Sequence, residues 1–179
     1  LAAFYERERG MLKDDNLRAS WLIFGQGFYQ GMTRDVVKRL FDVFVSVILM
    51  IVTLPLVLGA VVLIVLESGW PVLYRQERVG QGGVPFTILK LRSMRQDAEK
   101  DGRPQWAKAA DVRVTRVGRF IRMTRIDELP QLYNVLRGDM SFVGPRPERP
   151  FFVDQLIADI PYYDVRHSVK PGVTGWSQV

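Results

Sequence analysis

An adjacent pair of acids followed by a rigid basic turn is the part of the sequence best suited to chemistry. Within residues 124–150, TRIDELPQLYNVLRGDMSFVGPRPERP, Asp127 and Glu128 are neighbours, and a Gly-Pro-Arg-Pro turn holds Arg146 between two prolines. A rigidly placed arginine can bind a phosphate through two parallel hydrogen bonds. Carboxylates can hold Mg²⁺, and an aspartate can itself attack phosphorus to form an acyl phosphate. These residue types therefore predict Mg²⁺-assisted phosphoryl transfer.

The same acids also fit a purely structural role. Asp127 suits the N-cap and Pro130 the first turn of a short helix that Gly138 would end. In that interpretation Asp127 is only a cap and Glu128 only a first-turn acid. Basic residues on both sides of the pair, among them Arg122, favour the chemical interpretation because they would hold a phosphate near the helix start.

Residues 72–94 predict two strands around a glycine-rich turn, and the second strand carries two cations. Lys90 and Arg92 are two residues apart, so they would project from the same face. They could contact a phosphate, or they could simply guard a solvated strand edge. Lys170, directly before a Pro-Gly pair, is a further candidate anion contact, whereas His167, the single histidine, is given no role.

Residues 111–125 place apolar and basic side chains at about helical spacing, which predicts an amphipathic helix. The apolar stripe is Val114, Val117 and Ile121, and arginines flank it. Such a helix could lie on an anionic membrane surface, or it could be an ordinary surface helix.

Residues 40–66 form an almost wholly apolar run whose single charge is Asp42. As one helix the run would extend roughly 40 Å, and a bilayer core needs about 20 such residues. Pro55 interrupts it near the middle, with Thr53 placed to bond a carbonyl that the proline frees. Basic residues, which mark the cytoplasmic side, flank both ends: Arg34, Lys38, Arg39, Arg75 and Arg78. A re-entrant helix that turns back at Pro55 and a kinked spanning helix both fit; a buried soluble helix fits less well, because such helices are normally shorter.

The charge balance points to an anionic partner. The 179 residues suffice for one domain with a core, and the absence of cysteine excludes disulfides and thiolate chemistry. A net charge of +6 and a pI of about 9.8 suit a lipid surface, nucleic acid or a phosphorylated substrate. Nucleic acid is disfavoured, since the sequence has no recognition motif and no stacking series of aromatics. Because the chain starts at Leu1 and stops at GVTGWSQV, we expect a fragment of a longer protein.

The segments KLRSM, DELPQLYNVLRGDMSFVGPRP and VKPGVTGWSQV, together with the proline-centred apolar run, resemble the bacterial sugar transferases, the monotopic polyprenyl-phosphate phosphoglycosyl transferases. The likeness covers residues 33–179 and is to the long, exopolysaccharide-type members. It implies transfer of a sugar 1-phosphate from a UDP-sugar to undecaprenyl phosphate, with release of UMP, at the cytoplasmic face of the bacterial inner membrane. Exopolysaccharide or a related glycan would be started in this way.

The resemblance also implies a fold and a domain plan. The fold would be α/β and mostly helical, with a re-entrant membrane helix broken at Pro55 and a small cytosolic catalytic domain that has a short β-hairpin and interfacial amphipathic helices. Residues 1–32 would be a connector from an upstream region, residues 33–68 the membrane anchor, and residues 69–179 the catalytic domain. That domain would be incomplete at its C-terminus, since family members continue beyond GWSQV.

Roles for the site residues follow from the same resemblance. Asp127 would attack the β-phosphate to form a covalent phosphosugar intermediate, and Glu128 would hold Mg²⁺ or carry a proton; both acids are the candidate metal ligands. The phosphate-binding candidates are Arg122, Arg146, Lys90, Arg92 and Lys170.

An alternative from another class remains open. A membrane-anchored basic scaffold that binds acidic partners without catalysis would explain the charge, although not the adjacent acids beside the GPRP turn. A homo-oligomer also stays open.

Overall fold

The structure is a computed structural model that describes residues 32–98 and 111–175. The predicted connector, apart from Met32, lies outside the described residues. The chain divides after Asp35 into two units, and everything below concerns the second, apart from the first residues of the long helix.

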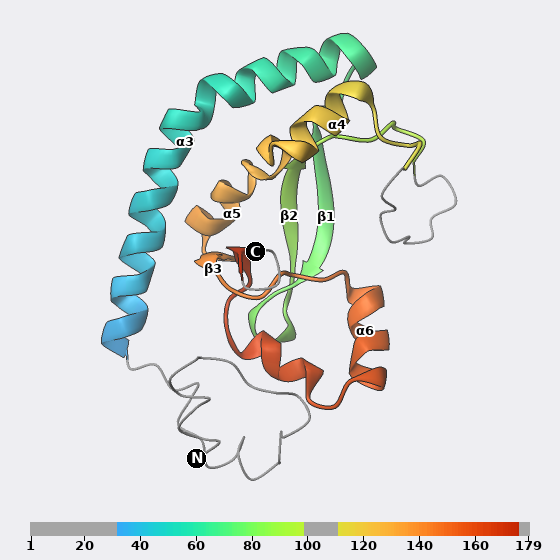
Figure 1. Cartoon of the computed structure of the whole chain (residues 1–179). Helices are drawn as coiled ribbons and strands as arrows, with labels where there is room; N and C mark the ends of the chain where they lie inside the picture. Colours follow the sequence, from blue (N-terminus) through green and yellow to red (C-terminus); the bar gives the residue numbers. More distant parts are fainter. Residues whose placement is uncertain (1–31, 99–110, 176–179) are drawn as a thin grey trace, which may run out of the picture. The chain divides into compact units, whose positions relative to one another are not determined.

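The described residues form an α/β fold that is mostly helical, as predicted (Figure 1). A long helix α3 (Met32–Ser68) precedes an antiparallel hairpin of β1 (Leu73–Val79) and β2 (Pro85–Leu91). Gly82 and Gly83 supply positive φ angles of 66° and 78° in the turn, which confirms the glycine-rich hairpin. The remaining elements are α4 (Arg116–Met123), the 3₁₀ turn η4 (Ile126–Glu128), α5 (Gln131–Arg137), β3 (Ser141–Val143), α6 (Pro150–Asp159), the 3₁₀ segment η5 (Tyr163–Ser168) and β4 (Gly172–Thr174), which pairs in parallel with β3.

Helix α3 stays helical through Pro55 but is visibly bent along its length (Figure 1). Proline removes the backbone bond to the carbonyl four residues earlier, here that of Ile51. The Thr53 hydroxyl donates instead to the Leu49 carbonyl, 2.6 Å away. The expectation that Thr53 would bond the freed carbonyl is therefore wrong, because the threonine bonds back along its own turn.

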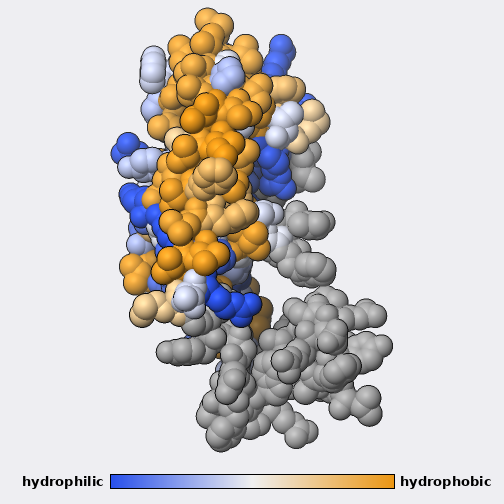
Figure 2. All heavy atoms as spheres, turned by 90° about the vertical axis from the view of Figure 1, so that its left-hand side faces the viewer, coloured by the Kyte–Doolittle hydropathy of each residue, from blue (hydrophilic) through white to orange (hydrophobic). Residues whose placement is uncertain are grey.

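The apolar surface of α3 faces outward. Only Asp42, Ser46, Ala60 and Ile64 are buried along the helix, and Figure 2 shows an almost continuous hydrophobic face over it. By length and composition this is a helix able to cross a membrane, and only 11% of its most apolar window is buried in the protein. A core helix of a soluble protein would be mostly covered, so this exposed apolar face indicates membrane association.

Both ends of α3 are bonded to the folded domain. Near the start, Arg39 donates to the carbonyls of Val135 (2.5 Å) and Leu136 (2.6 Å) at the end of α5, and the buried Asp42 accepts from the Phe142 amide. At the other end, Arg92 donates to the carbonyls of Ser68 (2.9 Å) and Gly69 (2.5 Å).

The Glu67 carboxylate adds two further bonds at that end, because it accepts from the amides of Arg116 (2.8 Å) and Val117 (3.0 Å). It thereby binds the free donors at the start of α4. The middle of α3, between Ser46 and Ala60, has no buried residue.

Two apolar clusters position the elements around the acid pair. The first joins Ala60 and Ile64 of α3 to Val72, Leu91 and Ile121. Ile121 is buried on one side of α4 and Arg116 and Arg119 are exposed, so this helix is amphipathic as predicted. Each side chain of the size of Ile121 contributes about 1.5–3 kcal/mol when fully buried. Val114, predicted as part of the apolar stripe, instead precedes α4 and forms a β-bridge with Met94.

The second cluster joins Ile88 of β2 to Val135 and Met140. Asn134, fully buried on α5, fixes the register of this contact: its Oδ1 accepts from the Leu89 amide (3.1 Å) and its Nδ2 donates to the Thr87 carbonyl (2.7 Å). Helix α5 ends at Gly138, which adopts φ 99° as predicted for a glycine C-cap.

Candidate active site

The acid pair lies in a 3₁₀ turn and does not cap an α-helix. Asp127 and Glu128 belong to η4, whereas α5 begins three residues later, with Pro130 at its N-cap. The chain enters η4 through Arg125, whose φ of 60° is left-handed and uncommon for a residue with a side chain. The prediction that Asp127 is a helix N-cap is therefore wrong, because a separate turn intervenes between the acids and the helix.

Glu128 is the centre of an ion-pair network. Its Oε1 lies 2.8 Å from Lys90 Nζ and 3.4 Å from Arg146 Nη2, and its Oε2 lies 3.7 Å from Arg125 Nη1. Burial would raise the pKa of Glu128, but Lys90, then Arg146 and Arg125, outweigh it and hold the pKa below its usual value. The carboxylate is thus ionised at neutral pH.

Burial also lowers the pKa of Lys90, against the opposing pull of Glu128. The 2.8 Å contact of the two groups favours the charged pair.

Asp127 has a carboxylate oxygen that is free to bind a ligand. Its side chain is buried, with 7% of the residue exposed, and its Oδ1 has no hydrogen-bond partner. Burial raises the pKa of Asp127, the neighbouring Glu128 raises it further, and Lys90 and Arg122 oppose the shift. A buried carboxylate oxygen without a partner is costly, and such groups occur at functional sites.

The two acids fit Mg²⁺, although no cluster of three acidic, histidine or cysteine ligands is found within residues 32–98 and 111–175. Mg²⁺ is usually bound by one or two carboxylates, with waters and substrate phosphates completing the shell. The unpartnered Oδ1 of Asp127 is a ready ligand of that kind.

The Gly-Pro-Arg-Pro turn is clamped at three consecutive carbonyls. The Pro145 carbonyl accepts from the Gly172 amide (3.0 Å), the Arg146 carbonyl from Arg166 (2.8 Å), and the Pro147 carbonyl from Arg78 (2.9 Å). These bonds, added to the prolines, fix the backbone from which Arg146 reaches Glu128.

The sequence does not indicate that Arg78 of β1 or Arg166 of η5 contributes to the site; it shows Arg78 only as a basic flank of the apolar run. Arg166 is held in place by Tyr163, since its guanidinium lies 4.7 Å from the ring centroid. Arg166 donates to the carbonyl of Arg146, which lies 20 residues earlier in the chain. Nothing in the sequence around Arg166 indicates this contact.

The predicted phosphate-binding residues separate into two groups. Lys90 and Arg146 contact Glu128, and Arg122 is close enough to lower the pKa of Asp127. Arg92 instead lies past the end of β2 and binds the last carbonyls of α3. The structure therefore does not bring Arg92 and Lys90 to one site, since Lys90 contacts Glu128 and Arg92 contacts the end of α3.

Lys170 also lies apart from the acid pair. Its Nζ would be 3.9 Å from a Cβ at Gly138, the residue that ends α5, and Arg39 lies at the same place. The acids are at the opposite end of α5, so Lys170 is not brought to them.

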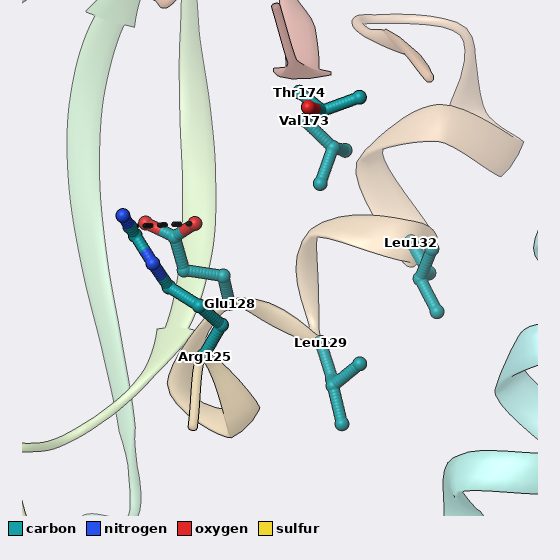
Figure 3. Close-up of a pocket in the computed structure, with 6 residues that line it drawn as sticks. All are labelled: Arg125, Glu128, Leu129, Leu132, Val173 and Thr174. Carbon is teal, nitrogen blue, oxygen red and sulfur yellow. Dashed lines mark ion pairs between the residues drawn. The ribbon is translucent and has the colours of Figure 1, made fainter. Parts of the chain in front are cut away.

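A pocket of about 320 Å³ opens beside the acid pair (Figure 3). Figure 3 shows the Arg125–Glu128 ion pair on one side, Leu129 and Leu132 opposite, and Val173 close to Thr174 at a third edge. The site thus combines anion-binding groups with an apolar wall.

The cost of the buried carboxylate predicts a stabilising substitution. In a protein without Mg²⁺ or substrate, Asp127→Asn should raise the free energy of unfolding at neutral pH by about 1 kcal/mol, or the melting temperature by about 2–4 °C. Because burial raises the folded-state pKa of Asp127, the folded protein loses stability when this carboxyl ionises as the pH rises through that pKa. Asparagine does not ionise, so the variant avoids the loss. Thermal melts in EDTA across pH 5–8 would measure it, with the exposed Asp154→Asn as control. The gain should shrink towards acid pH; a gain independent of pH would contradict the explanation.

Together, the fold and the site define a membrane-associated domain with a buried acid pair, surrounded by lysine and arginine side chains of the kind that bind phosphate. The sequence matches the family described as bacterial sugar transferase over residues 33–179, and the chain belongs to that family. The resemblance seen in its motifs is thereby confirmed.

Two relatives illustrate the match. The UDP-N-acetylgalactosamine-undecaprenyl-phosphate N-acetylgalactosaminephosphotransferase of Aeromonas hydrophila is 53% identical over 143 residues, which cover 80% of this chain and 34% of that protein. The UDP-glucose:undecaprenyl-phosphate glucose-1-phosphate transferase of Caulobacter vibrioides is 52% identical over 147 residues, covering 81% and 54%. The chain therefore spans about a third to a half of these relatives.

Proposed function

We propose that this chain transfers a sugar 1-phosphate from a UDP-sugar to undecaprenyl phosphate through a covalent intermediate on Asp127. The observation that carries the proposal is the buried, unpartnered Oδ1 of Asp127 beside the cations that surround Glu128. The names of the two relatives supply the substrate classes. The product would start an exopolysaccharide or a related glycan.

In the first half-reaction, a carboxylate oxygen of Asp127 attacks the β-phosphorus of the donor. The new O–P bond forms as the bond from the β-phosphorus to the bridging oxygen breaks, and UMP leaves with the electron pair. In the second half-reaction, an oxygen of the lipid phosphate attacks the same phosphorus and the Asp127 carboxylate is released. Lys90 and Arg146 stabilise the charge that develops on the phosphoryl oxygens.

Mg²⁺ held by Asp127 or Glu128 would neutralise the diphosphate and polarise the bond that is broken. Glu128, whose pKa is held down first by Lys90, keeps Lys90 and Arg146 in position around the attacked phosphate. The ionised Asp127 carboxylate needs no general base to attack phosphorus.

The contacts at the two ends of α3 support a re-entrant anchor. Arg39 and Asp42 near one end, and Ser68 near the other, are bonded to the same folded domain. A helix that spanned the bilayer would put these ends on opposite sides, and a single small domain could not bind both. The basic flanks then favour the cytoplasmic face for both ends.

The anchor geometry predicts the sidedness of two residues. Cysteines placed at Arg34 and Arg75 should both be inaccessible to a membrane-impermeant thiol reagent in intact cells and should both react after permeabilisation. The chain has no cysteine of its own, so the signal comes only from the introduced residues. A cysteine at either position that reacts from outside intact cells would rule out the re-entrant anchor.

The function itself is tested by turnover. Protein, Mg²⁺, undecaprenyl phosphate and a panel of radiolabelled UDP-sugars should yield a lipid-linked sugar phosphate and UMP with at least one donor. The alternative, a non-catalytic basic scaffold, predicts binding of acidic partners but no lipid-linked product with any donor.

A further inference from the structure

The two oxygens of the Glu128 carboxylate contact different cations. Oε1 faces Lys90 and Arg146, at 2.8 and 3.4 Å, whereas Oε2 faces Arg125 at 3.7 Å. A second hollow of only about 10 Å³ lies on the Oε1 side, and its lining includes Arg78 as well as Lys90 and Arg146. One side of Glu128 therefore has two cations paired with it, and the other has one; Arg78 is itself paired with Glu148 and bonded to the Pro147 carbonyl.

The walls on the two sides differ as well. The pocket on the Arg125 side is lined otherwise by Leu129, Leu132, Val173 and Thr174, which makes it largely apolar (Figure 3). Leu132 belongs to α5, and α5 is bonded through Arg39 to α3, the helix that carries the exposed apolar face. One side chain of the apolar wall, Leu132, thus belongs to an element that is joined directly to the membrane helix.

The two substrates of the proposed reaction differ in the same way. A UDP-sugar has two linked phosphates between polar groups, whereas a polyprenyl phosphate has one phosphate on an apolar chain. The two cations Lys90 and Arg146 match the two charges of the diphosphate, and one cation beside an apolar wall matches the lipid phosphate. A volume of about 320 Å³ is at the lower end for a ligand pocket, so it holds only the start of a long lipid.

Arg125 has the properties of a residue that receives an incoming phosphate. Its backbone is left-handed at φ 60°, a conformation that costs on the order of 1 kcal/mol for a residue with a side chain. Its side chain is 64% exposed, and its contact with Glu128 is long, at 3.7 Å. It can therefore turn from the carboxylate to a ligand without breaking a buried contact. Strained backbone of this kind clusters at ligand-binding sites.

We propose that the Arg125 pocket binds the phosphate and first isoprenoid units of the polyprenyl phosphate acceptor, while the Lys90–Arg146 side of Glu128 binds the diphosphate of the nucleotide donor. This assignment rests on the proposed function. It makes Arg125 a determinant of acceptor binding and leaves donor binding to the other cations.

The test compares Arg125→Ala and Leu129→Gln with Arg119→Ala, which removes an exposed arginine of α4 away from the pocket. With a UDP-sugar that supports turnover, Arg125→Ala should raise the KM for geranylgeranyl phosphate about tenfold, because a charge-assisted bond to the phosphate is lost. Adduct formation from the donor alone should fall much less than acceptor use, because Lys90 still pairs with Glu128 at 2.8 Å. Leu129→Gln should weaken the acceptor in the same selective way, and Arg119→Ala should change neither quantity.

Binding without turnover separates this inference from the proposed function. The wild type should bind geranylgeranyl phosphate more tightly than geranylgeraniol, and Arg125→Ala should lose most of that preference. A wild type that shows this preference but makes no product would overturn the proposed function and keep the acceptor pocket. An active Arg125→Ala variant with an unchanged acceptor KM, or with donor and acceptor steps slowed equally, would overturn the pocket and keep the function.

Discussion

Asp127→Asn should lose about a thousandfold or more of the transferase activity while the protein stays folded. The amide is close in shape to the carboxylate but cannot act as a nucleophile towards phosphorus, so both half-reactions should stop. The structure removes the main structural objection to this test, because Asp127 caps no α-helix and its Oδ1 bonds no other group. Loss of activity with an unchanged or raised melting temperature would therefore report on chemistry.

The intermediate gives this prediction a direct readout. Wild-type protein incubated with a UDP-sugar and Mg²⁺, without lipid, should gain one sugar phosphate on Asp127 and release UMP. The adduct should be labile to hydroxylamine, as acyl phosphates are, and initial rates should follow a ping-pong pattern. Mass spectrometry of the intact protein would measure the adduct in the wild type and its absence in Asp127→Asn.

Glu128→Gln is the matched comparison. It removes the anion that pairs with Lys90, Arg146 and Arg125, so activity should fall strongly, although the attacking oxygen remains. A slow adduct should therefore still form in Glu128→Gln and never in Asp127→Asn. An active Asp127→Asn enzyme, or a wild type that shows a ternary-complex rate pattern and no adduct, would contradict the mechanism.

Arg146→Lys should lower kcat/KM roughly tenfold to a hundredfold, although the charge is kept. A lysine cannot present the planar pair of donors that matches a phosphate, and losing a charge-assisted bond costs about 1.5–3 kcal/mol. The loss should be large here because the backbone of the turn is fixed: Pro145, Arg146 and Pro147 each have their carbonyl bonded, so it cannot shift to bring a shorter side chain into place.

Arg149→Lys is the control, since Arg149 follows the turn and lies at the start of α6. It should change kcat/KM by no more than about twofold. Steady-state kinetics with both variants would decide the matter. Equal losses at the two positions would mean that the arginines act as a general basic patch and that the clamped turn does not position Arg146 for a phosphate.

Local patterns in the sequence were enough to predict the main parts of this protein. The apolar run, the hairpin around Gly82 and Gly83, the amphipathic α4 and the end of α5 at Gly138 each follow from residues close together in the chain. The acid pair and the rigid basic turn were also visible, because adjacent carboxylates and an arginine between prolines are local features. Residue types and spacing determine such features before any tertiary contact is made.

Only the tertiary structure decided which cations meet the acids. Asn134 fixes α5 on β2 so that Lys90 reaches Glu128, whereas Arg92, just past the end of the strand, binds α3 instead. Arg78 and Arg166, which bond the carbonyls of the GPRP turn, are far from it in the chain. Because α5 starts after the acids, Asp127 does not cap it, and its Oδ1 has no hydrogen-bond partner. These contacts depend on strand register and on packing between distant segments, and a change of one or two residues in register moves a side chain to another partner.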